Sequence, residues 1–208
     1  MRGVAFLAAM LAACSPEPRR AFPIGLQGPV SPRVSAEATR LGLVVAEPTP
    51  EGAVVEAAAA VSGVAADWRT LRLLSARAAV NGSGGFFFQL PSMSAGRDIL
   101  DFPEEWQAPA RVLRELQAVR PVLEDGLDTP LPFIVPTGAA ARAWVFRRRV
   151  YVLLVNPSVV DAPFDPDALR TWRALFEVQS DARQVLSPCG AKRCLAPGAA
   201  LWLEGRLL

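Results

Sequence analysis

The sequence predicts an α/β region followed by an all-β region: a parallel β/α unit precedes a C-terminal antiparallel β-sandwich. Two patterns predict this division. Residues 22–126 alternate short apolar runs with amphipathic helical segments, whereas residues 127–208 hold short apolar runs separated by prolines and aspartates. The 208-residue chain is 51% hydrophobic, which is enough for a sizeable core and excludes a disordered tail.

The β/α region is expected to open with a strand, a helix and a second strand. Residues 22–29 are a short apolar run that contains glycines. Ser31 and Pro32 then form a helix start, with serine as the N-cap and proline at the first helical position. Gly42 ends the helix, and the apolar run 43–46 is the second strand. The tight connections favour a parallel pair of strands.

Two helical segments are expected before the third strand. The first is the alanine-rich stretch 54–61, and in the second, apolar residues recur at helical spacing from Trp68 to Ala78. The glycine-rich segment 81–85 ends this second helix. The phenylalanine-rich run 86–90 is then the third strand, and a fourth strand remains open.

A long helix is expected to close the β/α region. Asp101, with Glu104 three residues later, is typical of a capping arrangement at the start of this helix. Its apolar face carries Trp106, and Pro121 and Gly126 are expected to end it.

The period of the apolar pattern changes after Gly126. The runs 143–146 and 150–155 are rich in β-branched and aromatic residues, which favours two consecutive strands. The arginines at 147–149 between them are interpreted as a solvated hairpin turn. Further short strands are expected at 133–135, 174–177, 184–186 and 200–204. Together these runs predict the β-sandwich.

The N-terminus is typical of a secretory signal. Arg2 precedes the apolar run 4–11, which is too short to span a hydrocarbon core of about 30 Å, and small residues follow it. The ending Leu-Ala-Ala-Cys at 11–14 resembles a bacterial lipobox. This resemblance implies that residues 1–13 are removed and that Cys14 is acylated; the alternative is a buried helix with a stray cysteine.

An acylated Cys14 implies a lipid-anchored protein of the bacterial cell envelope, whose membrane partner is the lipid bilayer. Residues 14–21 then form a lipidated tether. Because Ser15 rather than aspartate follows the cysteine, the resemblance to Gram-negative sorting rules favours the outer membrane over the inner membrane.

Three cysteines leave one pair once Cys14 is lipidated. Cys189 and Cys194 flank a turn-like segment, and in an oxidising compartment they are expected to form a disulfide that closes a small loop. The alternative, a metal or redox pair, lacks a third cysteine or a histidine nearby.

The composition excludes several function classes. The chain has no histidine, which excludes histidine general-base catalysis, Ser-His-Asp hydrolysis and histidine metal sites. With 22 basic and 20 acidic residues, the chain lacks the strongly positive electrostatic potential that attracts nucleic acid. We therefore expect no metal, no cofactor and no nucleic-acid partner, while carboxylate chemistry stays possible.

Several motifs together resemble bacterial TIM-barrel glycosidases that carry a C-terminal accessory β-sandwich. The segments 22–26 and 41–45 are similar to the first strand and second strand of such barrels, and 78–88 is similar to the entry into the eighth strand. The segment 106–123 resembles the last barrel helix. The segments 150–156 and 201–205 resemble strands of the accessory sandwich.

The chain departs from that family in length. Residues 14–126 are too few for a closed eight-stranded barrel, which takes about 200 residues or more. The resemblance therefore implies a partial barrel-like unit without the middle strands that carry the catalytic carboxylates, so no catalytic residue is carried over. The first, second and eighth strands would then lie in the spatial order 43–46, 22–27, 86–90.

The carboxylates at strand ends are the remaining candidates for a ligand site: Glu47, Asp98 and Asp101. Each also has a structural interpretation, as a loop charge for Glu47 and Asp98 and as the helix cap for Asp101. Aromatic rings that bind sugars would be exposed, and Trp68 and Trp172 are the candidates, although core positions are the favoured interpretation of both.

These observations favour a non-catalytic, membrane-anchored envelope lipoprotein with a binding or structural role, derived from a glycosidase-like ancestor. Its expected partners are the bilayer and either a carbohydrate or another envelope protein. The alternative is an active glycoside hydrolase that uses carboxylate acid/base chemistry on an envelope or extracellular polysaccharide.

Overall fold

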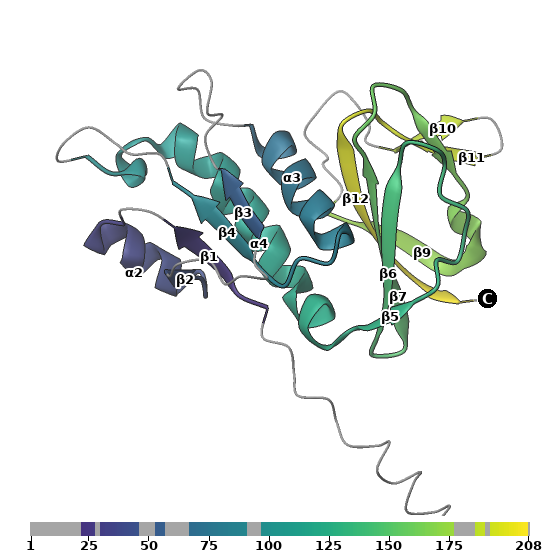
Figure 1. The fold of residues 1–208 in the computed structure, drawn as a ribbon, viewed down its shortest axis with the longest axis horizontal. Helices are drawn as coiled ribbons and strands as arrows, with labels where there is room; N and C mark the ends of the chain where they lie inside the picture. The colour runs from purple at the N-terminus through teal and green to yellow at the C-terminus, as the bar shows by residue number, and fades with distance from the viewer. Residues whose placement is uncertain are drawn as a thin grey trace, which may run out of the picture.

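The computed structural model describes residues 22–27, 30–45, 53–56, 67–90, 97–176, 186–189 and 192–207. Cys14, Glu47, the signal and the tether lie outside this part of the chain. A parallel sheet occupies one side of the molecule and antiparallel sheets the other, with helix α3 (Trp68–Val80) between them (Figure 1). The chain thus combines mixed α/β structure with all-β structure.

The parallel sheet contains four strands in the described residues, in the spatial order β2 (Val44–Val45), β1 (Ile24–Gln27), β4 (Phe86–Gln89) and β3 (Ala53–Glu56). All three pairings are parallel. The order expected for the first, second and third predicted strands is therefore confirmed. Ile24, Leu26, Phe86 and Phe88 are fully buried on the face of the sheet that packs against the helices.

Strand β3 corrects the prediction of a helix over 54–61. Residues 53–56 pair in parallel with β4, and residues 57–61 lie outside the described part of the chain. Val54 and Val55 are β-branched residues, which favour a strand, and the alanines beyond them gave the segment its helical appearance.

In the described part of the chain, three α-helices accompany the parallel sheet. Helix α2 (Pro32–Arg40) begins as predicted, because the Ser31 Oγ accepts a hydrogen bond from the Val34 amide at 3.2 Å. Helix α3 begins after Asp67, whose carboxylate accepts from the amides of Arg69 and Thr70. These side chains satisfy amides that have no partner within the helix.

Helix α4 (Pro103–Asp125) ends at Gly126 as predicted, but it differs from the prediction at its N-cap and at Pro121. Its N-cap is Phe102, without a side-chain cap, so Asp101 does not cap this helix. At the other end, the helix continues through Pro121 for another turn. Val119 and Val122 on either side of this proline are buried, and this packing offsets the backbone hydrogen bond that the proline lacks.

The antiparallel part contains a five-stranded sheet and a three-stranded sheet in the described residues. The five-stranded sheet has the order β5 (Leu127–Thr129), β6 (Ala140–Phe146), β7 (Arg149–Asn156), β12 (Ala199–Leu207) and β9 (Leu169–Leu175). The three-stranded sheet has the order β10 (Leu186–Cys189), β11 (Lys192–Leu195) and β8 (Ala162–Phe164).

The arginine turn is a two-residue hairpin between β6 and β7. Phe146 pairs with Arg149, so the turn consists of Arg147 and Arg148, with φ angles of 49° and 64°. Positive φ at both positions is the geometry that usually selects Asn-Gly.

The strand predicted at 133–135 does not form, because prolines at 132 and 136 flank it in the sequence.

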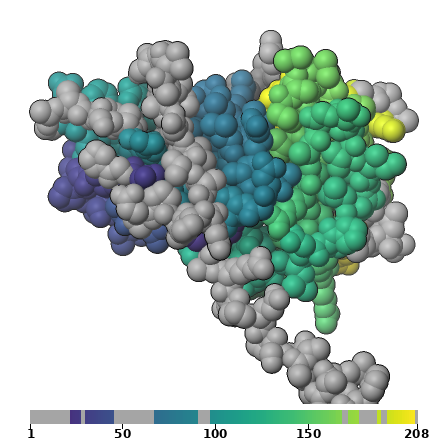
Figure 2. Space-filling model, viewed as in Figure 1, coloured from purple at the N-terminus to yellow at the C-terminus, as the bar shows by residue number. Residues whose placement is uncertain are grey.

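The five-stranded sheet is covered on both faces. Val152 and Leu154 of β7 pack in one cluster with Phe164 and Leu195 of the three-stranded sheet. Leu153 and Val155, which alternate with them, belong to a second cluster that includes α3, α4 and the parallel sheet. The antiparallel part therefore shares a core with the helices, and Figure 2 shows α3 lying directly against the antiparallel part.

Candidate functional site

Two of the predicted carboxylates meet at the carboxyl-terminal edge of the parallel sheet. Asp98 caps the short 3-10 helix η1 (Ile99–Asp101), and its Oδ1 accepts a hydrogen bond from the Leu100 amide at 2.8 Å. The Asp101 Oδ2 accepts from the Asp98 amide at 2.9 Å. Together the two residues form a capping box, so Asp101 does take part in a cap, but of η1 rather than of α4.

Both carboxylates are also bonded to the start of α2. The Ser31 Oγ donates to the Asp98 Oδ2 at 2.7 Å, and the Arg33 guanidinium donates to the Asp101 Oδ1 at 2.7 Å. The hydrogen bond from Arg33 is the main reason that the pKa of Asp101 lies below its usual range, and the hydrogen bond from the Asp98 amide is the second. A general acid needs a raised pKa, so Asp101 does not have the properties of one.

The two cysteines predicted to form a disulfide lie in one hairpin of the three-stranded sheet. Cys189 in β10 pairs with Lys192, and Cys194 in β11 pairs with Ser187. The backbone therefore places the two cysteines at diagonal positions of neighbouring strands, and Cys194 is buried. Their pairing as a disulfide stays a prediction.

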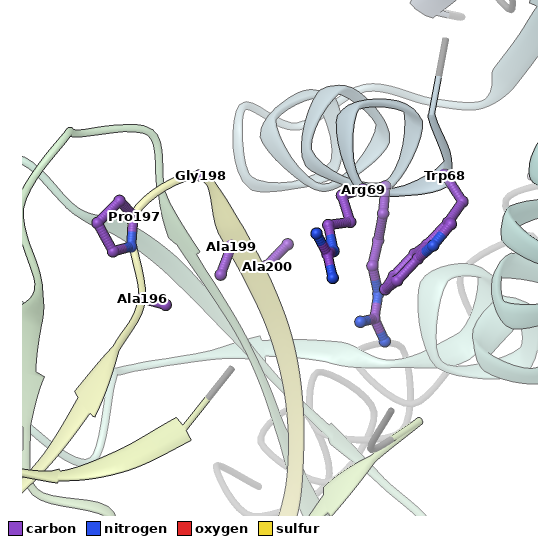
Figure 3. Close-up of a pocket in the computed structure, with 8 residues that line it drawn as sticks. Trp68, Arg69, Ala196, Pro197, Gly198, Ala199 and Ala200 are labelled. Carbon is purple, nitrogen blue, oxygen red and sulfur yellow. The ribbon is translucent and has the colours of Figure 1, made fainter. Parts of the chain in front are cut away.

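A pocket that sequence analysis did not predict lies between α3 and the antiparallel part. Trp68, Arg69 and Arg72 line one side, and the segment from Ala196 to Ala200, which leads into β12, lines the other. Figure 3 shows Trp68 and Arg69 extending from the helix on one side of the pocket, with Ala199 and Ala200 on the other side. The cavity has a volume of about 200 Å³. We call it the junction pocket.

Trp68 is the aromatic centre of the junction pocket. Its side chain is half-buried and lines the cavity, so the interpretation of Trp68 as an ordinary core residue is incomplete. The guanidinium carbon of Arg111 lies 3.9 Å from the centre of the indole ring, that of Arg69 at 5.4 Å and that of Arg72 at 5.9 Å. These distances allow cation–π attraction between the arginines and the ring.

Arg72 forms the floor between the junction pocket and the core. Its Nε lies 2.8 Å from the Glu115 Oε2 on α4, and its Nη2 donates to the Phe176 carbonyl at 3.2 Å. Burial raises the pKa of Glu115 and lowers that of Arg72, whereas their mutual attraction acts in the opposite direction on each. Arg72 and Glu115 therefore form a buried ion pair beside the cavity.

Trp172, the second aromatic candidate, has a structural role. Its indole Nε1 donates to the Asp167 Oδ1 at 3.1 Å, and its ring packs beside the core of the two antiparallel sheets. It does not line the junction pocket.

The described residues contain no group of three or more cysteine, aspartate or glutamate side chains that could hold a metal ion. No helix in the described ranges is both long and apolar enough to cross a bilayer.

The chain has low similarity to solved structures. No family model and no curated protein sequence matches it. Eubacterium rectale Amy13B aligns with a TM-score of 0.45 and 14% identity over 68% of this chain. A GH30 endoxylanase from Clostridium papyrosolvens C71 aligns with a TM-score of 0.42 and 8% identity over 88% of this chain. The aligned part spans 34% of the first neighbour and 49% of the second.

Proposed function

We propose that this chain is a non-catalytic protein of the bacterial cell envelope, anchored to a membrane through acylated Cys14, with a binding or structural role and a glycosidase-like ancestry. The lipobox-like sequence at 11–14 supports the anchor. Two acyl chains or more give stable attachment, at about 0.8 kcal/mol per buried methylene group. Ser15 after the cysteine supports the outer membrane as the destination.

The bonding of Asp98 and Asp101 is the observation that carries the non-catalytic role. A glycosidase needs one carboxyl group to donate a proton and a second one to act on the sugar or on water. Here, Ser31, Arg33 and backbone amides already bind the two carboxylates at the sheet edge. The lowered pKa of Asp101 also disfavours its protonated form near neutral pH.

Metabolic labelling with a clickable fatty acid tests the anchor. The wild-type chain should carry the label, whereas Cys14→Ser should not, because serine offers no thiol for the thioether. Cys189→Ser is the matched control, since it removes a cysteine but leaves residues 11–14 intact. Equal labelling of the wild type and Cys14→Ser would refute the anchor.

Hydrolysis assays on envelope and extracellular polysaccharides test the non-catalytic role. We expect no turnover above that of a buffer blank. If turnover is found, the triple variant Glu47→Ala, Asp98→Ala, Asp101→Ala separates two cases. Loss of the rate in a folded triple variant would establish the hydrolase alternative, whereas an unchanged rate would indicate a contaminating enzyme.

A further inference from the structure

Arginines gather at the end of the five-stranded sheet where the β6–β7 hairpin turns. Arg147 and Arg148 form the turn itself, and both side chains are exposed. Arg149 is the first residue of β7, and the strand register places Arg173 on β9 and Arg206 on β12 at the same end of the sheet. We call this end of the sheet the hairpin end.

The geometry of the turn does not itself explain its two arginines. The φ angles of Arg147 and Arg148 are 49° and 64°, values that glycine, asparagine and aspartate adopt more readily than arginine does. In the described residues, neither guanidinium forms an ion pair, although that of Arg147 lies 5.0 Å from the centre of the Phe146 ring. Two cations without a neutralising carboxylate therefore stand at the tip of the sheet.

The carboxylates around the hairpin end are already engaged within the described part of the chain. The Glu204 carboxylate lies 2.7 Å from an Arg149 nitrogen and 2.6 Å from an Arg173 nitrogen. On β5, Asp128 binds an arginine of β6 at 2.8 Å, and the two acidic residues that end α4 also have partners. The charge that the turn presents to solvent is therefore positive.

The tether expected at 14–21 joins the described chain at the same end of the molecule. The Phe22 amide donates to the Glu124 Oε1 at 3.3 Å, close to the end of α4. Strand β5 follows directly, and its Leu127 pairs with Val145, two residues before the turn. Figure 1 shows the start of β1, the end of α4 and the β6–β7 turn at one end of the molecule. Because eight residues span about 29 Å at most, a lipid at the start of the tether would hold this end toward the bilayer.

We propose that the hairpin end binds the headgroups of anionic phospholipids and so orients the anchored protein on the membrane. Guanidinium groups bind phosphate oxygens through paired hydrogen bonds, and each basic residue close to an anionic leaflet adds to the attraction. This attraction is screened over about 8 Å at physiological salt, so it acts only on the end of the protein that the tether holds near the bilayer. The inference rests on the membrane location proposed above and adds a lipid class and a membrane-facing surface.

The test is flotation of the full-length Cys14→Ser chain with vesicles of phosphatidylcholine, alone or mixed with phosphatidylglycerol. This parent chain cannot be acylated, and its apolar run at 4–11 should contribute alike to both kinds of vesicle. We expect tighter binding to the anionic vesicles and a loss of this preference at high salt. Arg147→Gln with Arg148→Gln should reduce the preference about 25-fold, or about fivefold for each arginine.

Lys192→Gln with Arg193→Gln is the matched control, because it removes two adjacent exposed cations from β11, which lies far from the β6–β7 turn in Figure 1. This variant should keep the preference, and so should Arg147→Lys with Arg148→Lys, which retains both charges. The proposal is overturned if the parent chain does not prefer anionic vesicles, if the two glutamine pairs lower the preference equally, or if the lysine pair lowers it as much as glutamine does. Failure of the anchor is seen separately, in the labelling of Cys14.

Discussion

Arg72 on α3 and Glu115 on α4 form an ion pair of 2.8 Å, and both side chains are nearly buried, with 8% and 12% of their surfaces exposed. The pair joins two helices next to the five-stranded sheet, where Leu116 and Trp202 also pack. Removing a charge from water is costly, and the cost is offset only when the partner remains in place. The two residues should therefore behave as one unit in mutational experiments.

Arg72→Met should lower the free energy of unfolding at pH 7 by about 3 kcal/mol, because it leaves the buried Glu115 without its closest cation. The double variant Arg72→Met, Glu115→Leu should recover most of this loss. Urea denaturation followed by circular dichroism measures both. Arg77→Met, an exposed change on the same helix, serves as the control. A double variant no more stable than Arg72→Met would contradict the pairing.

The raised pKa of Glu115 predicts a pH dependence with a definite sign. A raised folded pKa means that the folded protein holds the Glu115 proton more tightly than the unfolded chain does. The stabilising contribution is therefore present below the unfolded pKa of about 4.3 and is lost as the pH rises through the raised folded value. Compared with Glu115→Gln, the wild type should lose unfolding free energy as the pH rises from about 4. A difference between the two proteins that is constant from pH 4 to 7 would contradict this.

Asp101 should show the opposite dependence. Its lowered pKa means that the ionised form is favoured on folding, so its contribution is present above the unfolded pKa of about 3.9 and is lost as the pH falls through the lowered folded value. Asp101→Asn should lower the thermal midpoint at pH 6, and the deficit should shrink under strongly acidic conditions. A deficit that is as large under strongly acidic conditions as at pH 6 would contradict this.

The diagonal positions of Cys189 and Cys194 in the β10–β11 hairpin support the predicted disulfide. Alkylation of the native protein should modify neither thiol before reduction and both afterwards, as mass spectrometry would show. Because the loop is short, Cys189→Ala should cost only about 2 kcal/mol of stability. A Cys189 thiol that reacts without a reductant would rule the disulfide out.

The elements that follow strong local signals could be predicted from the sequence. Ser31 with Pro32 marks the start of α2, and the apolar run at 86–90 contains β4. The errors arose where tertiary packing overrides a local signal. Pro121 does not end α4 because the residues around it are buried, and the Ala-rich character of 54–61 conceals a strand.

The junction pocket could not be predicted because it depends on long-range docking. Its two walls, around Trp68 and Gly198, are far apart in the sequence and meet only when α3 packs against the five-stranded sheet. Arginines are also mostly exposed in proteins, so nothing in the local sequence marks Arg72 as buried. Asp98 and Asp101 could be predicted as candidates because they follow a predicted strand. Their hydrogen-bond partners at the start of α2, Ser31 and Arg33, could not be predicted from the local sequence.

The double coverage of the five-stranded sheet has a consequence for dissecting this protein. Cutting the chain after Gly126 would expose the sheet face that carries Leu153, Trp144 and Trp202. The indole rings of the two tryptophans stack on this face with their centroids 5.4 Å apart. A contiguous apolar face of this kind promotes aggregation when it meets water. The antiparallel half is therefore not an independently folding domain. Expressed alone, it should precipitate or self-associate through this face. In the intact chain, the two halves should unfold in a single thermal transition.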